Sequence, residues 1–260
     1  MTLHFYKYQG TGNDFVIMDN RDGRYDSLTN QQVHDLCHRR FGIGADGLML
    51  LNTQPGYDFG MKYYNADGNE SSMCGNGGRC LTAFARKMGL TQEKLRFLAV
   101  DGPHEATMTG DSWVNLKMQD VDSVEHGPLY FYLNTGSPHF VKFVNDVQSL
   151  DVFTEGRQIR YNDRFAAEGT NVNFVQEQDK GIFVRTYERG VEDETYSCGT
   201  GVTAAALTAA GPETKEYRIP VQTLGGNLEV WFTKTGERTF EDIWLCGPAT
   251  LVFEGDVTIN

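Results

Sequence analysis

Two cysteines stand on glycine-rich turns of the same form, Cys74-Gly75-Asn76-Gly77 and Cys198-Gly199-Thr200-Gly201. Each turn leads into a run of small residues that is typical of a helix. A free thiol has a pKa of about 8.5, and the N–H groups and dipole at a helix N-terminus favour its thiolate. Each turn therefore predicts a cysteine that can act as a base.

The glycines of the two turns predict a second role. Because glycine has no side chain, the N–H groups after each cysteine stay open to an anion such as a carboxylate. A single turn of this kind is more often a buried cysteine beside a helix cap. Two on one chain favour two thiols that face one carbon, one removing a proton as thiolate and the other returning one. Backbone N–H groups would stabilise the carbanion, and no lysine has a recognisable Schiff-base setting, so we expect no cofactor.

An internal repeat relates the two turns. An offset of 124 residues separates Cys74 from Cys198. The same offset relates three further pairs: Gly12 with Gly136, Phe59 with Phe183, and Tyr63 with Tyr187. A duplication of this length predicts two similar domains, with the seam near residue 119, rather than a solenoid.

Each half repeats one order of elements: an apolar strand after a glycine turn, a later strand, the Cys-Gly turn and a helix. The expected strands are 15–18, 57–64, 112–118, 140–144, 181–187, 228–232 and 250–253. The expected helices are 79–88 and 202–210, one in each half, and 30–40, which Thr29 and Gln32 can cap. These elements predict an α+β fold with two pseudo-symmetric domains, each a mostly antiparallel sheet wrapped around a central helix.

The composition limits the class of partner. The 260 residues carry a formal net charge of −12, and 40% are hydrophobic, enough for sizeable cores. Basic residues do not cluster beyond Arg39-Arg40, so we expect no nucleic-acid partner. We recognise no signal peptide and no membrane-spanning stretch. Five cysteines, an odd number, do not suggest a disulfide framework, so we expect a cytoplasmic protein with a small-molecule substrate.

Other reactive residues are assigned structural roles. His34, Cys37 and His38 share one face of the predicted helix, but no fourth ligand accompanies them, so we expect no metal site. Cys80 is expected in the core. The run Glu192-Asp193-Glu194 is expected to be a solvated loop.

At the motifs described above, the chain resembles the diaminopimelate epimerases. The matching segments follow the family's order: 12–15 (GNDF), 42–47 (GIGADG), 65–68 (NADG), 73–77 (MCGNG), 171–174 (NVNF), 188–190 (ERG) and 198–201 (CGTG). The resemblance implies a cofactor-independent homodimeric enzyme that interconverts LL- and meso-diaminopimelate, precursors of lysine and peptidoglycan. It also implies a first domain of residues 1–119 completed by 248–260, a second domain of residues 120–247, and an active site in the cleft between them.

The resemblance assigns roles residue by residue. Cys74 and Cys198 match the acid/base pair. The two nests that hold the carboxylate at the reacting carbon match Gly75, Asn76, Gly199 and Thr200. Contacts to the rest of the substrate match Asn13, Asn65, Asn171, Glu188 and Arg189. Residues that tune the thiols match His139 and Glu188. A guanidinium such as that of Arg189 suits the distal carboxylate of a substrate with two amino-acid ends.

Two positions depart from the family. Many members have Asn at the position of Ser137, and some have Gln at the position of Gly47. Because serine is shorter and forms fewer hydrogen bonds, we expect water or another residue to contribute to recognition of the distal end.

Two other functions remain open at this point. A proline or hydroxyproline racemase would need a small closed pocket with no partner for a second carboxylate, and Arg189 argues against it. A redox-sensing or binding protein would join Cys74 and Cys198 in a disulfide. Activity measured with and without a reductant separates that reading from catalysis.

Overall fold

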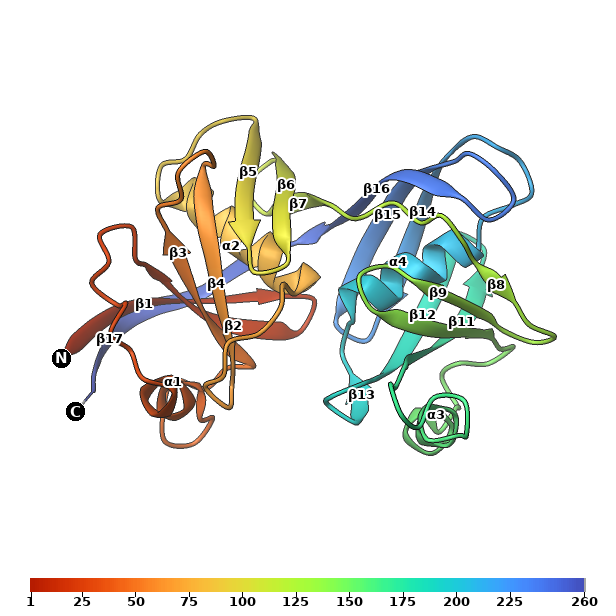
Figure 1. Cartoon of the computed structure of the whole chain (residues 1–260), viewed down its shortest axis with the longest axis horizontal. Coiled ribbons are helices and arrows are strands. Elements are labelled where there is room, and N and C mark those ends of the chain that lie inside the picture. The colour runs from red at the N-terminus through yellow and green to blue at the C-terminus, as the bar shows by residue number, and fades with distance from the viewer. Residues whose placement is uncertain (260) are drawn as a thin grey trace. The chain divides into compact units, whose positions relative to one another are not determined.

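In a computed structural model, which describes residues 1–259, the chain forms two compact units (Figure 1). The first unit contains residues 1–116 and returns from residue 247 onward, and the second contains Lys117–Cys246. Each unit has one central helix surrounded by strands and one further helix. The described part of the chain therefore contains four helices and seventeen strands.

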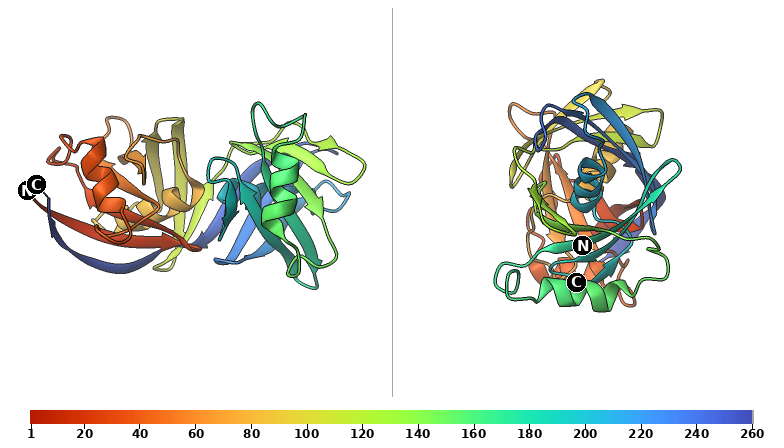
Figure 2. Two further views of the ribbon diagram at one scale, coloured as in Figure 1. Left: turned by 90° about the horizontal axis from the view of Figure 1, so that it is seen from below. Right: turned by 90° about the vertical axis from the view of Figure 1, so that its right-hand side faces the viewer.

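The first unit pairs its strands in the order β17-β1-β2-β3-β4-β5-β6-β7. Their bounds are β1 (Thr2–Gly10), β2 (Asn13–Asp19), β3 (Gly47–Asn52), β4 (Phe59–Asn65), β5 (Lys94–Ala99), β6 (Gly102–Thr109), β7 (Trp113–Lys117) and β17 (Thr250–Thr258). The pairs β2–β3 and β4–β5 are parallel and the others antiparallel. Figure 2 shows β1 and β17 running together, and the Met1 amino group donates to the Ile259 carbonyl at 2.8 Å.

The second unit has the same pairing, in the order β8-β9-β10-β11-β12-β14-β15-β16. Their bounds are β8 (Glu125–His126), β9 (Phe131–Asn134), β10 (Pro138–Phe143), β11 (Asn171–Gln178), β12 (Gly181–Glu188), β14 (Glu216–Thr223), β15 (Gly226–Lys234) and β16 (Phe240–Pro248), with β13 (Asp193–Thr195) beside β12. Here β10–β11 and β12–β14 are the parallel pairs.

The two units therefore repeat one topology, and the predicted α+β fold is confirmed. Helix α2 (Gly75–Lys87) contacts β1, β2, β3, β4, β6 and β17, and α4 (Gly199–Thr208) contacts β9, β10, β11, β12, β14 and β15. The turns that precede β2 and β10 also match, because Gly12 has a φ of 86° and Gly136 a φ of 112°. Both angles lie in the left-handed region that favours glycine.

The central helices are built of small residues because strands surround them. In α2, every residue from Gly75 to Ala85 is buried, and a Cβ on Gly77 would overlap the methyl of Met49. In α4, Ala204, Ala205 and Ala206 are fully buried. A helix enclosed in this way is apolar or small on all sides rather than amphipathic.

The predicted helix bounds were partly wrong. The central helices start at Gly75 and Gly199, not at residues 79 and 202, because packing overrides the low helix propensity of glycine. Helix α1 (Asn30–Cys37) has the predicted capping box of Thr29 and Gln32 but ends three residues early.

Helix α3 (Val152–Arg160) was not predicted. It packs outside the sheet on β11, β12 and β13 (Figure 1). The seven predicted strands correspond to β2, β4, β7, β10, β12, β15 and β17. The other ten strands were not predicted.

Candidate active site

Both candidate cysteines are the N-cap residues of the central helices. The Cys74 carbonyl accepts the N–H of Gly78 at 2.7 Å, and the Cys198 carbonyl accepts that of Val202 at 2.8 Å. Cys198 is 8% exposed and Cys74 is half-buried. At a helix N-terminus, the first N–H groups have no acceptor within the helix and the dipole is positive. Each thiol therefore lies where negative charge is stabilised, on itself or on a bound carboxylate.

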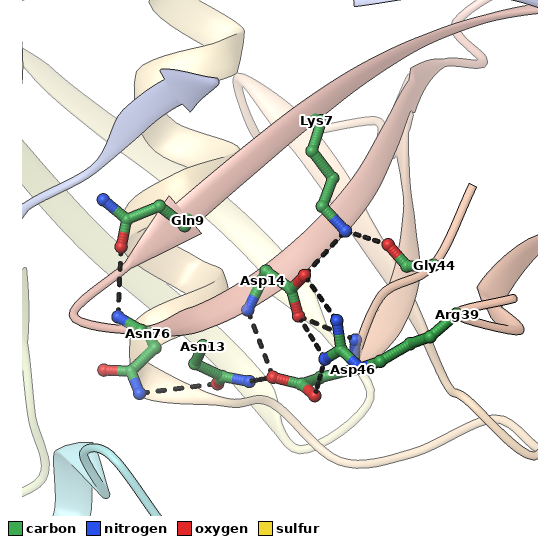
Figure 3. Close-up of polar contacts among 9 residues, drawn as sticks. Lys7, Gln9, Asn13, Asp14, Arg39, Gly44, Asp46 and Asn76 are labelled. Atoms are coloured by element: carbon green, nitrogen blue, oxygen red, sulfur yellow. Dashed lines mark hydrogen bonds and ion pairs between the residues drawn. The ribbon is translucent and has the colours of Figure 1, made fainter. Parts of the chain in front are cut away.

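In the first unit, Asn13 connects Cys74 to the loop before β3. Its Oδ1 accepts from Cys74 Sγ at 3.4 Å. It also accepts from Asn76 Nδ2 at 3.4 Å (Figure 3). Its Nδ2 donates to Asp46 Oδ2 at 2.6 Å. Because a carboxylate oxygen only accepts, this bond fixes which end of the Asn13 amide faces the sulfur.

Three charged residues, Lys7, Asp14 and Arg39, form a network that holds the Asp46 carboxylate in place. Lys7 Nζ lies 2.7 Å from Asp14 Oδ2 and also donates to the Gly44 carbonyl. Arg39 donates to both oxygens of Asp14, at 2.7 and 2.9 Å, and to Asp46 Oδ1 at 2.6 Å (Figure 3). Burial raises the pKa of Asp14, but the hydrogen bonds from Arg39 and Lys7 outweigh it and hold that pKa far below its ordinary value. We call Lys7, Asp14, Arg39 and Asp46 the charged cluster.

Asn65 lies at the same end of the first unit. It is opposite Gly47 in the β3–β4 pair, and the next residue, Ala66, donates its N–H to the Asp46 carbonyl at 3.0 Å. At Gly47, a Cβ would overlap the Tyr64 carbonyl oxygen and the Tyr63 ring. The Tyr63 ring therefore occupies the space that a larger side chain at position 47 would need.

In the second unit, hydroxyl groups connect Cys198 to a histidine. Cys198 Sγ lies 3.5 Å from Thr200 Oγ1, which lies 3.1 Å from Ser137 Oγ. Ser137 Oγ in turn lies 3.1 Å from His139 Nε2 and accepts from Asn171 Nδ2 at 3.1 Å. Ser137, which was expected to form fewer hydrogen bonds than an asparagine, thus contacts three side chains.

His139 is neutral in this site. The residue is fully buried, and burial, together with the positive charge of Arg189, lowers its pKa from 6.5 to about 3. Its Nδ1 lies 3.1 Å from the Asn173 amide nitrogen. A Cβ on Gly201 would overlap Asn173 Oδ1, so α4 needs a glycine there to let this asparagine approach.

Asn171, Glu188 and Arg189 lie together where β11 begins and β12 ends. Asn171 Oδ1 accepts the Arg189 N–H at 2.9 Å, and the Arg189 guanidinium donates to the Glu168 carbonyl at 3.0 Å. Glu188 accepts from Thr195 at 2.8 Å.

The structure thus places the predicted residues in two clusters, one in each unit. The first contains Asn13, Asn65, Cys74, Gly75 and Asn76. The second contains His139, Asn171, Glu188, Arg189, Cys198, Gly199 and Thr200.

Sequence reasoning missed the roles of the charged cluster, Ser137 and Asn173. One signal was available: Lys7 follows Leu3 and Phe5 at alternate positions of one strand, and all three are buried. A buried lysine needs a carboxylate partner.

The acidic run after β12 was predicted to be a solvated loop, which is confirmed for the exposed Asp193 and wrong for Glu192 and Glu194. Glu194 pairs with Arg185 at 2.6 Å. Glu192 pairs with Arg160 at 3.2 Å and accepts from the Tyr187 hydroxyl at 3.2 Å.

Cys80 is fully buried as predicted, and burial raises the pKa of its thiol to about 12. Among residues 1–259, no helix is long and apolar enough to span a membrane.

Solved structures with a similar fold include a PhzF-family phenazine biosynthesis protein of Bacillus anthracis. It matches with a TM-score of 0.72 at 15% identity over 100% of both chains. A hydroxyproline epimerase of Agrobacterium vitis matches with a TM-score of 0.69 at 14% identity over 98% of this chain and 92% of the other. These TM-scores establish a shared fold, and at identities this low nothing beyond the fold follows.

Sequence comparison is more specific. The family model of diaminopimelate epimerase matches residues 5–124 and 131–252. The chain is 48% identical to the diaminopimelate epimerase of Flavobacterium psychrophilum, over 97% of this chain and 99% of that protein. It is 44% identical to that of Chlorobaculum tepidum, over 96% of this chain and 99% of the other. The chain therefore belongs to the diaminopimelate epimerase family and is an isomerase.

Proposed function

We propose that this enzyme interconverts LL- and meso-2,6-diaminopimelate by a two-base mechanism in which Cys74 and Cys198 act on the same α-carbon. The observation that carries the proposal is their equivalence, since each cysteine is the N-cap of the central helix of its unit. One sulfur, as thiolate, removes the α-proton, and the other, as thiol, protonates the carbanion from the opposite face. The reaction needs no cofactor.

The two helix starts supply the electrostatic part of the catalysis. An α-proton of an amino acid is too weakly acidic for a thiolate alone, since a positioned base contributes about 10²–10⁴-fold. The backbone N–H groups at Gly75, Asn76, Gly199 and Thr200 would hold the adjacent carboxylate and stabilise the negative charge that develops on it. The same turns therefore present the acid and base and bind the substrate.

The rest of the substrate would be bound by the polar residues around these turns. The Arg189 guanidinium suits the distal carboxylate, and Asn13, Asn65, Asn171 and Glu188 offer amide and carboxylate groups for the distal ammonium and carboxylate. His139 and Glu188 would modulate the thiols. Residues 1–119 with 248–260, and 120–247, would be the two epimerase halves that share this site.

The substrate assigns the protein to lysine and peptidoglycan precursor biosynthesis. Assembly as a homodimer and a cytoplasmic location remain predictions. Size-exclusion chromatography with light scattering tests the first of them.

Substitution of each thiol tests the proposal. We expect Cys74→Ser and Cys198→Ser each to lower the rate of epimerisation of LL-diaminopimelate by at least about 10²-fold, because a serine hydroxyl is a far weaker acid than a thiol. Cys80→Ala, which removes a buried thiol from the same helix as Cys74, is the matched control and should keep most of the activity. A well-folded Cys74 or Cys198 variant with nearly the wild-type rate would remove that cysteine from the mechanism.

A further inference from the structure

Arg79 of helix α2 is the largest fully buried side chain among residues 1–259. A guanidinium stays protonated at any pH that a folded protein tolerates, so the first unit encloses a permanent positive charge. Burying a charge is unfavourable unless hydrogen bonds compensate for it. The presence of this arginine, one helical turn after Asn76, therefore calls for a reason beyond packing.

One nitrogen of this guanidinium connects two segments of the first unit. Arg79 Nη2 donates to Asn76 Oδ1 at 3.0 Å, at the start of α2, and to Thr11 Oγ1 at 3.3 Å, in the turn between β1 and β2. Gly10 lets the helix approach this turn, because a Cβ there would lie 3.4 Å from the same nitrogen and 3.2 Å from the Asn76 carbonyl oxygen. Arg79 therefore ties the turn before β2 to the start of the central helix.

The turn that Arg79 holds has an unfavourable backbone conformation. Thr11 is buried and has a φ of 49°, in the left-handed region that a β-branched residue rarely adopts. Asn13, the first residue of β2, follows this turn and contacts Cys74. A change in the turn would therefore move Asn13 relative to the sulfur.

The hydrogen bonds of Arg79 also fix the orientation of two amides. Because a guanidinium only donates, the amide oxygen of Asn76 faces Arg79 and its Nδ2 is turned toward Asn13 Oδ1, at 3.4 Å (Figure 3). At the other end, Asn13 Nδ2 donates to the Asp46 carboxylate at 2.6 Å. We call Arg79, Asn76, Asn13 and Asp46 the amide chain. With a cation at one end and an anion at the other, neither amide can be reversed without losing a bond to a charged group.

The second unit makes the same connection without a cation. The equivalent residues, related by the 124-residue offset, are Thr11 with Thr135, Asn76 with Thr200, and Arg79 with Thr203. Thr135 Oγ1 donates directly to the Thr200 carbonyl at 2.8 Å, whereas Thr203 Oγ1 donates to the Gly199 carbonyl of its own helix at 3.0 Å. A threonine hydroxyl thus suffices to hold the turn against the helix. The guanidinium of the first unit exceeds that task, which indicates that its role is to orient the amides.

We propose that Arg79 is a positioning residue of the epimerase: through Asn76 it holds the Asn13 amide in the orientation that binds the substrate. The inference rests on the proposed function, in which Asn13 and the start of α2 bind diaminopimelate. Since Arg79 is fully buried, it acts through these side chains and not on the substrate itself. Donors and acceptors held in place before binding reduce the cost of ordering them when the substrate arrives.

A double-mutant cycle on epimerisation tests the inference. The values of kcat and KM for LL-diaminopimelate are measured for the wild type, Arg79→Met, Asn76→Ala and the double variant, with folding checked by circular dichroism. Asn76→Ala removes the amide and keeps the backbone N–H. We expect each single variant to lower kcat/KM by on the order of tenfold, mainly through a higher KM. The double variant should be no worse than the weaker single variant, because both changes break the same amide chain.

Matched variants separate this role from a structural one. Arg79→Lys should recover most of the lost kcat/KM, because both bonds come from one nitrogen and an ammonium can donate to both acceptors. Thr203→Val, at the equivalent position of α4, removes a buried hydroxyl that bonds within its own helix and should keep nearly wild-type kinetics. If Arg79→Met does not fold, Arg79→Gln, whose shorter amide does not reach Asn76, takes its place in the cycle.

Four results would overturn the inference. They are a wild-type kcat/KM in folded Arg79→Met, a lower kcat with an unchanged KM, losses that multiply in the double variant, and an Arg79→Lys variant no better than Arg79→Met. An equal loss in Thr203→Val would reduce Arg79 to a packing residue and overturn it too. Failure of the proposed function is distinguishable, because it would appear in the wild type as no conversion of LL-diaminopimelate.

Discussion

The buried histidine makes the stability of the second unit depend on pH. Burial and the charge of Arg189 lower the pKa of His139 from 6.5 to about 3. Below pH 6.5, the unfolded chain takes up a proton at this residue while the folded chain does not. The stability that neutral His139 contributes is therefore present above pH 6.5 and is lost as the pH falls toward 3.

The size of the effect follows from the same shift. At 1.36 kcal/mol for each pH unit, protonation of His139 in the unfolded chain alone lowers the free energy of unfolding by about 2 kcal/mol between pH 7 and pH 5. His139→Gln removes this contribution and keeps a side chain that can donate toward Ser137. The assay is urea unfolding of both proteins at the two pH values. Carboxyl groups with lowered pKa, such as Glu125 at about 2, titrate alike in both proteins and cancel.

We expect the wild type to lose about 2 kcal/mol more than His139→Gln when the pH is lowered from 7 to 5. Nitrogen-15 NMR of the ring should show the Nε2–H tautomer throughout this range. The reason is that Asn173, whose Nδ2 also donates to the Phe140 carbonyl, donates its second N–H to Nδ1. Equal losses in the two proteins, or a ring that titrates near pH 6.5, would refute the reasoning about its burial and the direction of its hydrogen bonds.

Three further outcomes follow from the first unit. Asp14→Asn leaves the buried Lys7 ammonium without its carboxylate partner and the exposed Arg39 with Asp46 alone, and should lower the free energy of unfolding at pH 7 by about 3 kcal/mol; an unchanged urea midpoint would contradict this. Gly47→Ala places a Cβ against the Tyr64 carbonyl oxygen and should cost about 1–3 kcal/mol, so an unchanged melting temperature would show that β3 and β4 are paired differently. The Cys80 thiol, whose pKa burial raises to about 12, should resist iodoacetamide at pH 8 in the native protein and react in urea; equal rates in the two states would place it outside the core.

Most of what could be predicted about the fold came from the internal repeat with its offset of 124 residues. A constant offset relates residues that occupy equivalent positions, so Gly12 and Gly136, and the two cysteines, appear in the same places of the two units. The Thr29 capping box was also readable, because both of its hydrogen bonds are local. Helix α3 had a similar local signal that was overlooked, since Asp151 accepts the Thr154 N–H as its N-cap.

What could not be predicted depends on contacts between distant segments. The central helices begin in glycine-rich turns, which disfavour a helix in isolation, because the surrounding sheet admits only small residues there. The contact of Ser137 with Thr200 joins residues 63 positions apart. The pairing of Glu192 with Arg160 likewise depends on tertiary packing, so nothing local in the acidic run indicates that two of its carboxylates are ion-paired.

The central claim is that two different thiols act on one α-carbon. Conversion of LL-diaminopimelate by the reduced enzyme in deuterium oxide, followed by proton NMR and mass spectrometry from the first turnovers, tests it most directly. If one sulfur removes the proton and the other delivers a solvent deuteron, the meso product should carry deuterium at one α-carbon while the remaining LL substrate keeps its protons. Deuterium appearing in substrate and product at the same early rate would indicate a single base and contradict the account. Complete absence of exchange in a folded, reduced sample would contradict it as well.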